Sequence, residues 1–351
     1  MTDPRHLTFA LPGDITTLTG GYIYDRRLVE GLRAQGRQVE VLALPDSFPT
    51  PSPSQMAQAL ADLQALPADR PVIIDGLAFG ALDPAGVAAI RAPIVAMIHH
   101  PLAQESALPA DLADHLWRTE RANLAHARHV LVPSPHTRAM LVERYGVAPD
   151  RITVVRPGTD RPAQARAPAP VAPPLILSVG ILHPRKGHDV LIAALAQLAD
   201  LDWQAVIAGN PWDMPHVAAL EDQICDSGLG ARLDLAGRVA PERLAQLYSQ
   251  ASIFALATRY EGYGIVFDEA LSHGLPIVST RTGAVPDTVP QDAGLLVAPD
   301  DAPALAQALR RLLESPQDRA ACAAAAARAG AALPGWPDTA RLAGEVLDAL
   351  A

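Results

Sequence analysis

Short apolar segments alternate with amphipathic segments along most of the chain, and this alternation constrains the fold more than any other feature of the sequence. In the first half, strand candidates such as PVIIDGLAF and APIVAMIHH are separated by segments with helical periodicity such as TGGYIYDRRLVEGLRAQG. Strands that alternate with helices are typical of parallel sheets covered by helices on both faces. The pattern restarts after residue 174 with LILSVG, WQAVIAGNP, LDLAGRV, SIFALAT, PIVST and GLLVAP. The sequence therefore predicts an α/β protein with two doubly wound, Rossmann-like domains.

A proline-rich stretch separates the two halves. Five of the fourteen residues in 161–174 are proline, and because proline fixes φ and removes a backbone donor, a semi-rigid connector is expected there. We predict an N-terminal domain over 1–164, a linker over 165–174, a C-terminal domain over 175–333 and a final helix over 334–351. That helix could pack back on the N-terminal domain. Because ligands of open α/β sheets bind at the carboxyl ends of the strands, a cleft between the two domains is the expected place for chemistry.

The composition disfavours several classes of function. A formal charge of −10 and a low aromatic content disfavour nucleic acid as the main partner. No apolar run approaches the roughly 18 residues of a membrane span, and the first residues lack the layout of a secretory signal. Cys225 and Cys322 show no metal-ligand spacing, and both are expected to stay reduced. These observations predict a cytoplasmic protein.

Two junctions in the first half carry candidate ligand-binding residues. Gly20 and Gly21 precede the first long helix, where backbone N–H groups and the helix dipole favour a ligand oxygen, although an ordinary tight turn is the alternative. His99 and His100 follow the apolar run PIVAMI, and histidine can act as an acid, a base or a hydrogen-bond partner near neutral pH. The alternative is one structural and one surface histidine. Because no further histidine, cysteine or carboxylate completes an evident ligand set, a zinc site is disfavoured.

A cationic junction opens the second half. Arg185, Lys186 and Gly187 follow the strand candidate LILSVG, close to Gly180, and precede a predicted helix. Arginine can bind a phosphate through two hydrogen bonds, while lysine supplies a mobile point charge. Two solvated surface cations are the alternative. The position at the carboxyl end of a strand favours phosphate binding.

The segment EGYGIVFDE places Glu261 and Glu269 around a Gly-x-Gly turn. If a helix starts near Gly264, its first N–H groups can receive a diphosphate or a sugar hydroxyl. Two acids close to a phosphate conflict electrostatically, unless the acids bind hydroxyls while Arg185 and Lys186 hold the phosphate. We therefore expect Glu261 to accept hydrogen bonds from sugar hydroxyls and Glu269 to reach a diol such as a ribose. An amphipathic helix with solvated acids is the alternative.

Several segments, in the same order along the chain, resemble the retaining nucleotide-sugar glycosyltransferases of family 4, which have the two-domain GT-B fold. EGYGIVFDE resembles the E-x7-E motif of that family, and TGGYIYDRRLVEGLRAQGRQVEV resembles its glycine loop, first helix and second strand. The segments LILSVGILHPRKGHDVLIAAL, VIAGN, LDLAGRV, LPIVSTRTGAVPDTV and GLLVAPDD follow its C-terminal domain in order. The resemblance implies an activated-sugar donor held by the second domain and an acceptor held mainly by the first.

The resemblance also implies roles for individual residues. Lys186 would contact the donor diphosphate, Glu261 would hold sugar hydroxyls and Glu269 would bind the ribose. His99 falls where the family places a histidine near the transferred sugar, with His100 as the alternative, so His99, Lys186 and Glu261 form the implied catalytic set. The other implied donor-binding residues lie at helix starts and in the base pocket: Gly20, Gly21, Gly180, Arg185, Arg238, Val239, Gly262, Tyr263, Gly264 and Ile265.

The chain departs from the family pattern at Ile181, where many members carry arginine. Arg185 could supply the missing charge from the neighbouring turn, as in members with a Pro-Arg-Lys turn. Because of this departure, the residues that contact the phosphate are left open. The predicted class of donor does not change.

Together these features predict transfer of a glycosyl unit from a nucleotide diphosphate sugar to an unidentified acceptor hydroxyl, with retention and without a metal or another cofactor. No Asp-x-Asp ends a strand, so Arg185, Lys186 and the helix start would stabilise the leaving diphosphate. A nucleotide-sugar epimerase on the same fold and a catalytically silent sugar-nucleotide-binding protein remain alternatives. The acceptor could be a small molecule, a glycan or a lipid, which leaves peripheral membrane contact open.

Overall fold

The computed structural model of the chain describes residues 5–105, 108–160 and 171–350. The chain divides into two compact units, and each contains one six-stranded sheet. The strands of both sheets run parallel. The predicted fold class, two doubly wound α/β domains, is confirmed.

The two units differ from the predicted domains in how the chain is shared. The first unit combines residues 1–158 with 334–351, and the second spans residues 159–333. The predicted linker over 165–174 lies mostly outside the described residues, and only residues 171–174 of it are described.

The sheet of the first unit has the strand order β2-β1-β3-β4-β5-β6. Its strands are β1 (His6–Pro12), β2 (Gln38–Leu44), β3 (Val72–Asp75), β4 (Ile94–Met97), β5 (His129–Val132) and β6 (Ile152–Val154). Its helices are α1 (Gly20–Ala34), α2 (Pro53–Gln64), α3 (Gly76–Phe79), α4 (Pro84–Ala88), α5 (Ala110–Leu124), α6 (Pro135–Tyr145) and α14 (Trp336–Ala349), with short 3-10 turns η1 (Leu102–Gln104) and η2 (Pro149–Arg151). Because the strands are parallel, the carboxyl ends of β3 and β4 meet at one edge of the sheet.

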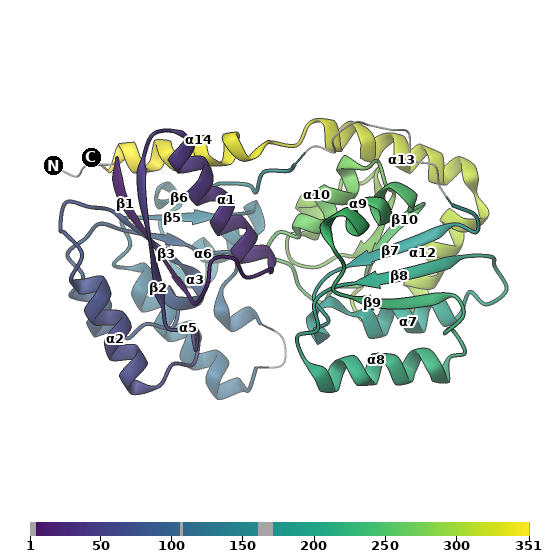
Figure 1. The fold of residues 1–351 in the computed structure, drawn as a ribbon, viewed down its shortest axis with the longest axis horizontal. Coiled ribbons are helices and arrows are strands. Elements are labelled where there is room, and N and C mark those ends of the chain that lie inside the picture. The colour runs from purple at the N-terminus through teal and green to yellow at the C-terminus, as the bar shows by residue number, and fades with distance from the viewer. Residues whose placement is uncertain (1–4, 106–107, 161–170, 351) are drawn as a thin grey trace. The chain divides into compact units, whose positions relative to one another are not determined.

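The C-terminal helix α14 packs against α1 within the first unit (Figure 1). Gly31 of α1 permits this close packing, since a Cβ atom there would lie only 2.5 Å from the Cβ of Ala340. The Thr339 hydroxyl donates to the carbonyl of Arg156 over 2.8 Å, which ties α14 to the segment that follows β6. Helix α14 is therefore part of the first α/β unit.

The sheet of the second unit has the strand order β12-β11-β10-β7-β8-β9. Its strands are β7 (Leu175–Val179), β8 (Gln204–Ala208), β9 (Leu233–Gly237), β10 (Ile253–Leu256), β11 (Ile277–Thr280) and β12 (Gly294–Val297). Its helices are η3 (Pro184–Lys186), α7 (His188–Ala196), α8 (Met214–Asp226), α9 (Pro241–Gln250), α10 (Ile265–Ser272), α11 (Val285–Thr288), α12 (Ala302–Glu314) and α13 (Pro316–Ala331).

Two apolar layers cover the faces of this second sheet. On one face, α7, α8 and α12 pack with strand residues such as Ile176 and Ile207. On the other face, α9, α10 and α13 pack with Leu177, Phe254 and their neighbours. Burial of strand side chains on both faces explains why these strands read as continuous apolar runs without strict alternation.

Most expected elements are found. The segment RITVVRPGTD forms only the three-residue strand β6, and most of the alanine-rich residues 318–332 lie within one helix, α13. The short helices α3 and α4 were not expected, because four or five residues are too few to show helical periodicity.

One buried acid of the first unit gives a prediction about stability. Glu120 of α5 is fully buried, and its Oε2 accepts the backbone N–H of Leu102 over 3.2 Å. Burial raises the pKa of Glu120 to about 8, against the opposing effects of Leu102 and Tyr145. The folded state then holds the proton of Glu120 more tightly than the unfolded state does. The stability that this proton contributes is present below the ordinary pKa of a glutamate and is lost as pH rises from there through 8.

We therefore expect Glu120→Gln to be more stable than the parent protein at pH 9, by about 2–4 kcal/mol, given about 1.4 kcal/mol per pH unit. At pH 5 the two proteins should differ little. Denaturant unfolding at both pH values measures the difference. Parallel loss of stability in both proteins between pH 5 and pH 9 would show that Glu120 does not cause it.

Candidate functional site

The turn that carries Arg185 and Lys186 is packed on the end of strand β10. The chain leaves β7 at Val179, makes η3 over Pro184–Lys186 and passes through Gly187 into α7. Gly187 has φ +64°, and a Cβ atom there would lie 2.0 Å from the carbonyl oxygen of Ala257. This left-handed conformation and this close approach both require glycine. The turn is therefore fixed against the residues that lead from β10 to Glu261.

Glu261 is the centre of a buried ionic cluster at this place. Its side chain is close to Lys186, with 2.6 Å between Lys186 Nζ and Glu261 Oε1, and Arg185 Nη1 lies 3.6 Å from Oε2. The Thr258 hydroxyl lies 3.1 Å from the same Oε1. Burial alone raises the pKa of Glu261, but Lys186 and Arg185 outweigh burial and lower it. The cluster thus holds an ionised carboxylate between two cations.

The helix α10 begins directly beside this cluster. Gly264 precedes Ile265, the first helical residue, with φ +89°, and its lack of a side chain leaves the helix start without a side-chain cap. The expected helix start near Gly264 is therefore found. Gly262 and Tyr263 complete the turn, and the Tyr263 side chain is tied to Asp268 by a hydrogen bond of 2.5 Å between hydroxyl and carboxylate.

Glu269 lies one turn into α10 and is held by a different partner. The Tyr248 hydroxyl donates to Glu269 Oε2 over 2.7 Å, and the Tyr248 ring stacks on His273 with 4.9 Å between ring centroids. Burial raises the pKa of Glu269, the Tyr248 hydrogen bond lowers it, and Asp160 raises it. The net pKa of Glu269 is therefore raised, whereas that of Glu261 is lowered.

The other predicted donor-binding residues of the second unit lie at the same edge of its sheet. Gly180 follows β7, and Arg238 and Val239 follow β9. The N–H of Gly209 donates to the carbonyl of Gly237 over 2.8 Å, which links the ends of β8 and β9. Arg238 is exposed, and no contact joins it to the ionic cluster within the part of the chain that the structure describes.

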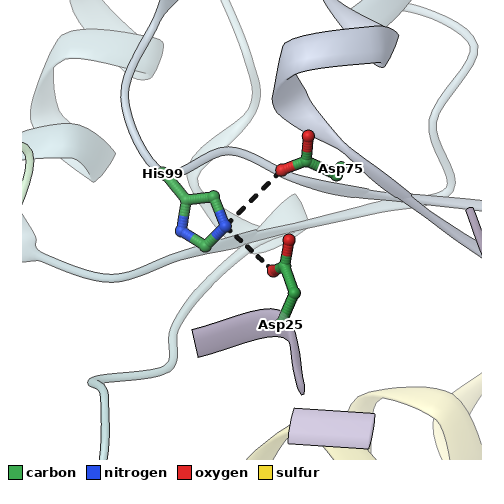
Figure 2. Close-up of side chains that lie close together, drawn as sticks. All are labelled: Asp25, Asp75 and His99. Carbon is green, nitrogen blue, oxygen red and sulfur yellow. Dashed lines mark hydrogen bonds and ion pairs between the residues drawn. The ribbon is translucent and has the colours of Figure 1, made fainter. Parts of the chain in front are cut away.

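The remaining predicted residues belong to the first unit, where the structure groups His99 with two carboxylates. His99 Nε2 lies 2.9 Å from Asp25 Oδ1 and 3.5 Å from Asp75 Oδ2 (Figure 2). Gly21 lies against the histidine ring, since a Cβ atom there would be 3.4 Å from His99 Cδ2. His100 instead faces Glu105, with 3.5 Å between Nε2 and Oε2.

This grouping contradicts one expectation from the sequence. We expected no carboxylate to complete a ligand set around His99, yet the ligand atoms of Asp25, Asp75 and His99 all lie within 4.8 Å of one another. The sequence gives one usable signal, because Asp75 ends an apolar strand at the edge where His99 also lies. Asp25 gives none, because it comes from the interior of α1 and is far from the other two in sequence.

Lys186 also stands out by composition. It is the only lysine among the 28 lysine and arginine residues of the chain. Every other permanent cationic side chain is therefore an arginine, whose planar guanidinium differs from a compact ammonium group in shape and hydrogen bonding. The one ammonium side chain is found in the buried cluster with Glu261.

Two known protein families match consecutive parts of the chain. Residues 20–161 match the family described as Glycosyltransferase Family 4, and residues 160–329 match the family described as Glycosyl transferases group 1. The chain belongs to these glycosyltransferases. The family predicted from the sequence motifs is thereby confirmed.

Curated relatives of the chain are also named as glycosyltransferases. It is 33% identical over 243 residues to the D-inositol 3-phosphate glycosyltransferase of Nocardia farcinica, a match that covers 64% of this chain and 54% of that protein. It is 32% identical over 237 residues to the protein of the same name from Kineococcus radiotolerans, with 60% and 54% covered. The chain spans about half the length of the curated relatives it matches.

Solved structures with the same fold cover nearly the whole chain. Sucrose-phosphate synthase from Thermosynechococcus elongatus is 23% identical, with a TM-score of 0.80 and 98% and 99% of the two chains covered. Anabaena HepE in complex with UDP-glucose is 18% identical, with a TM-score of 0.75 and 98% and 100% covered. These likenesses confirm the GT-B fold of the glycosyltransferase chain. Across its described residues, no helix combines the length and the apolar character that crossing a membrane requires.

Proposed function

We propose that this glycosyltransferase moves a sugar from a nucleotide diphosphate sugar to an acceptor hydroxyl, with retention of the anomeric configuration and without a metal. The observation that carries the proposal is the cluster of Lys186, Arg185 and Glu261 beside the start of α10. Anabaena HepE, which has the same fold, was solved with UDP-glucose. A nucleotide-sugar donor is therefore the ligand that we assign to the corresponding unit of this chain.

The charges of the cluster suit a diphosphate leaving group. Two cations and one carboxylate leave a net charge of about +1 at this place, and the start of α10 adds the positive end of a helix dipole. When the bond between sugar and diphosphate breaks, the diphosphate gains negative charge, which fixed cations and N–H groups stabilise. Lys186 and Arg185 would do this work without a metal ion. Glu269 would bind a diol of the donor through a carboxyl group that Tyr248 holds in place.

The contacts of Glu261 support a binding role over a nucleophilic one. Its Oε1 is engaged by Lys186 and lies close to the Thr258 hydroxyl, and its Oε2 faces Arg185. A carboxylate held in this way, with a lowered pKa, is a poor nucleophile but a good acceptor for sugar hydroxyls. We therefore propose retention by attack and departure on the same face of the sugar, without a covalent intermediate on Glu261.

A screen of nucleotide sugars tests the proposed function. The protein is incubated with UDP-, GDP- and ADP-sugars, binding is followed by thermal shift, and products are identified by mass spectrometry. D-inositol 3-phosphate, which the names of the curated relatives contain, and a cell extract serve as acceptors. We expect one donor to raise the melting temperature, to release its nucleoside diphosphate and to yield a glycosylated product with the anomeric configuration of the donor.

The two alternatives give different products in the same screen. An epimerase changes the sugar of the sugar nucleotide and glycosylates no acceptor. A silent binding protein shows a thermal shift without nucleotide release, both in the parent protein and in Glu261→Ala. Absence of binding by every nucleotide sugar would contradict the proposal itself.

Chelation of metal ions tests the proposed metal independence. We expect an excess of EDTA to leave the transfer rate unchanged, because Arg185 and Lys186 would supply the positive charge at the diphosphate. The rate is measured with and without added Mg²⁺ or Mn²⁺. A loss of activity that only a divalent cation restores would show that a metal takes part.

A further inference from the structure

The side chains of Asp25, Asp75 and His99 come from three different elements of the first unit and meet at one nitrogen atom. Asp25 lies on α1, Asp75 ends β3, and His99 follows β4. Only 2% of Asp25 and 5% of Asp75 is exposed, so the two acids reach His99 from the protein interior. Figure 2 shows both carboxylates on the Nε2 side of the ring, while Nδ1 points away from them.

Neighbouring groups fix the ring of His99 in this orientation. The ring of Tyr24 packs against it edge-on, with 5.2 Å between centroids and an interplanar angle of 79°. A Cβ atom on Gly21 would lie 3.4 to 3.8 Å from Cδ2, Nε2 and Cγ of the ring. No hydrogen bond to Nδ1 is present among residues 5–105, 108–160 and 171–350. The contacts at Nε2 thus fix the ring, and Nδ1 is left to bind another group.

The charges around His99 favour its protonated form. Burial by itself lowers the pKa of His99, but the carboxylates of Asp25 and Asp75 outweigh burial and raise it. Burial, and next the nearby Asp25, raise the pKa of Asp75 to about 7, while His99 lowers it. Burial and the nearby Asp25 raise the pKa values of both Tyr22 and Tyr24, that of Tyr22 to about 12. Both tyrosines therefore stay neutral near pH 7.

The net charge of the three groups points to a neutral ligand. Even a protonated His99 sets a single positive charge against the two carboxyl groups of Asp25 and Asp75, which lie 2.9 and 3.5 Å from its Nε2. A phosphate would gain little at such a place, whereas a hydroxyl oxygen accepts a hydrogen bond from an imidazolium without being repelled. The start of α1 lies beside the ring, since a Cβ atom on Gly21 would be 3.4 Å from His99 Cδ2, and Thr19 makes no side-chain cap there.

We propose that Asp25 and Asp75 are positioning residues, which hold His99 as an imidazolium with Nδ1–H directed at a neutral hydroxyl of a sugar or polyol substrate. The two acids act through His99 and do not touch the substrate. The nature of the ligand rests on the proposed function, whereas the orientation of His99 rests on its contacts with Asp25, Asp75 and Tyr24.

Nuclear magnetic resonance of the protein labelled with ¹⁵N-histidine tests the charge and orientation directly. His99→Asn identifies the signals of His99 among the 11 histidines. We expect His99 to carry protons on both nitrogens at pH 7 and to titrate at higher pH, and Asp25→Asn to lower its titration midpoint by about one unit or more. Asp75→Asn should lower the midpoint less, since its carboxylate is farther from Nε2.

Asp46→Asn is the matched control. Asp46 is an exposed acid that acts on Tyr22 but does not contribute to the pKa shift of His99. Its substitution should leave the His99 titration unchanged. An ordinary midpoint for His99 in the parent protein, or equal effects of all three substitutions, would overturn the inference. So would displacement of the Nε2 proton by added Zn²⁺ or Mn²⁺, because the three side chains would then form a cation site.

The pH dependence of transfer separates this inference from the proposed function. Asp25→Asn should lower kcat/KM by about tenfold at pH 8 and by clearly less at pH 6, where a histidine takes up a proton more readily. A purely structural defect would lower the rate equally at both pH values. Transfer with an ordinary His99 titration would overturn only the inference. A protonated His99 held by Asp25 in a protein that transfers no sugar would overturn only the proposed function.

Discussion

Lys186→Ala is expected to lower kcat/KM for sugar transfer by about 10²–10³-fold, the usual cost of removing one fixed group that stabilises developing charge. Its ammonium lies 2.6 Å from Glu261, where a leaving diphosphate would also need it. Among the described residues, the substitution also leaves the buried Glu261 with Arg185 as its one ionic partner, so donor affinity should fall as well. Steady-state kinetics and the thermal shift with nucleoside diphosphate measure the two losses.

Lys186→Arg is the informative companion of this substitution. Arginine keeps the charge, but its guanidinium is planar and larger. The aliphatic part of Lys186 packs close to Gly180, where a Cβ atom would lie 3.3 Å from Lys186 Cγ and Cδ. We therefore expect arginine to restore less than a tenth of the lost rate. Full activity in Lys186→Ala would remove Lys186 from the diphosphate site.

Gly187→Ala is expected to destabilise the second unit by about 3–5 kcal/mol, among the larger effects of single substitutions. An alanine there has φ +64° and a Cβ atom 2.0 Å from the Ala257 carbonyl, so the turn must move away from β10. Lys186 precedes the substituted residue, and donor binding should be lost with the turn. Hydrogen exchange of peptides from β7 and β10 should be about 10²-fold faster, which corresponds to about 3 kcal/mol.

Gly228→Ala provides a control with nearly the same backbone conformation. Gly228 has φ +66°, and no atom lies within 4 Å of a Cβ atom built there. Its substitution should therefore cost only the local strain of a left-handed alanine, about 1 kcal/mol, and should leave donor binding intact. Equal effects of the two substitutions would show that the contact with Ala257 does not matter.

The sequence predicts the fold and the place of the ionic cluster, because the strands, the helices and the cationic turn follow regular patterns. Apolar strands and amphipathic helices alternate with enough periodicity to define two parallel sheets, and the carboxyl ends of parallel strands meet at one edge. Arg185, Lys186 and Glu261 each follow a strand of the second sheet, and for this reason they meet. The Gly-x-Gly turn likewise marks the start of α10.

Contacts between side chains from the interiors of elements could not be predicted in this way. Asp25 reaches His99 from within α1, and its position in the sequence has no pattern that points to a histidine after β4. The direct pairing of Glu261 with Lys186 was also not expected, since the sequence pattern predicts that the acid binds hydroxyls and the cation binds phosphate. The catalytic and donor-binding roles of these residues stay predictions.

The single lysine of the chain permits the most direct test of the central claim, that Lys186 and the start of α10 bind the diphosphate of a nucleotide sugar. Protein labelled with ¹³C-lysine gives one Hε–Cε cross-peak, which belongs to Lys186, and it can be followed while UDP, GDP, ADP or the matching nucleosides are added. We predict that one nucleoside diphosphate shifts this cross-peak at saturation while its nucleoside does not. A cross-peak that none of the three nucleoside diphosphates moves would contradict the account.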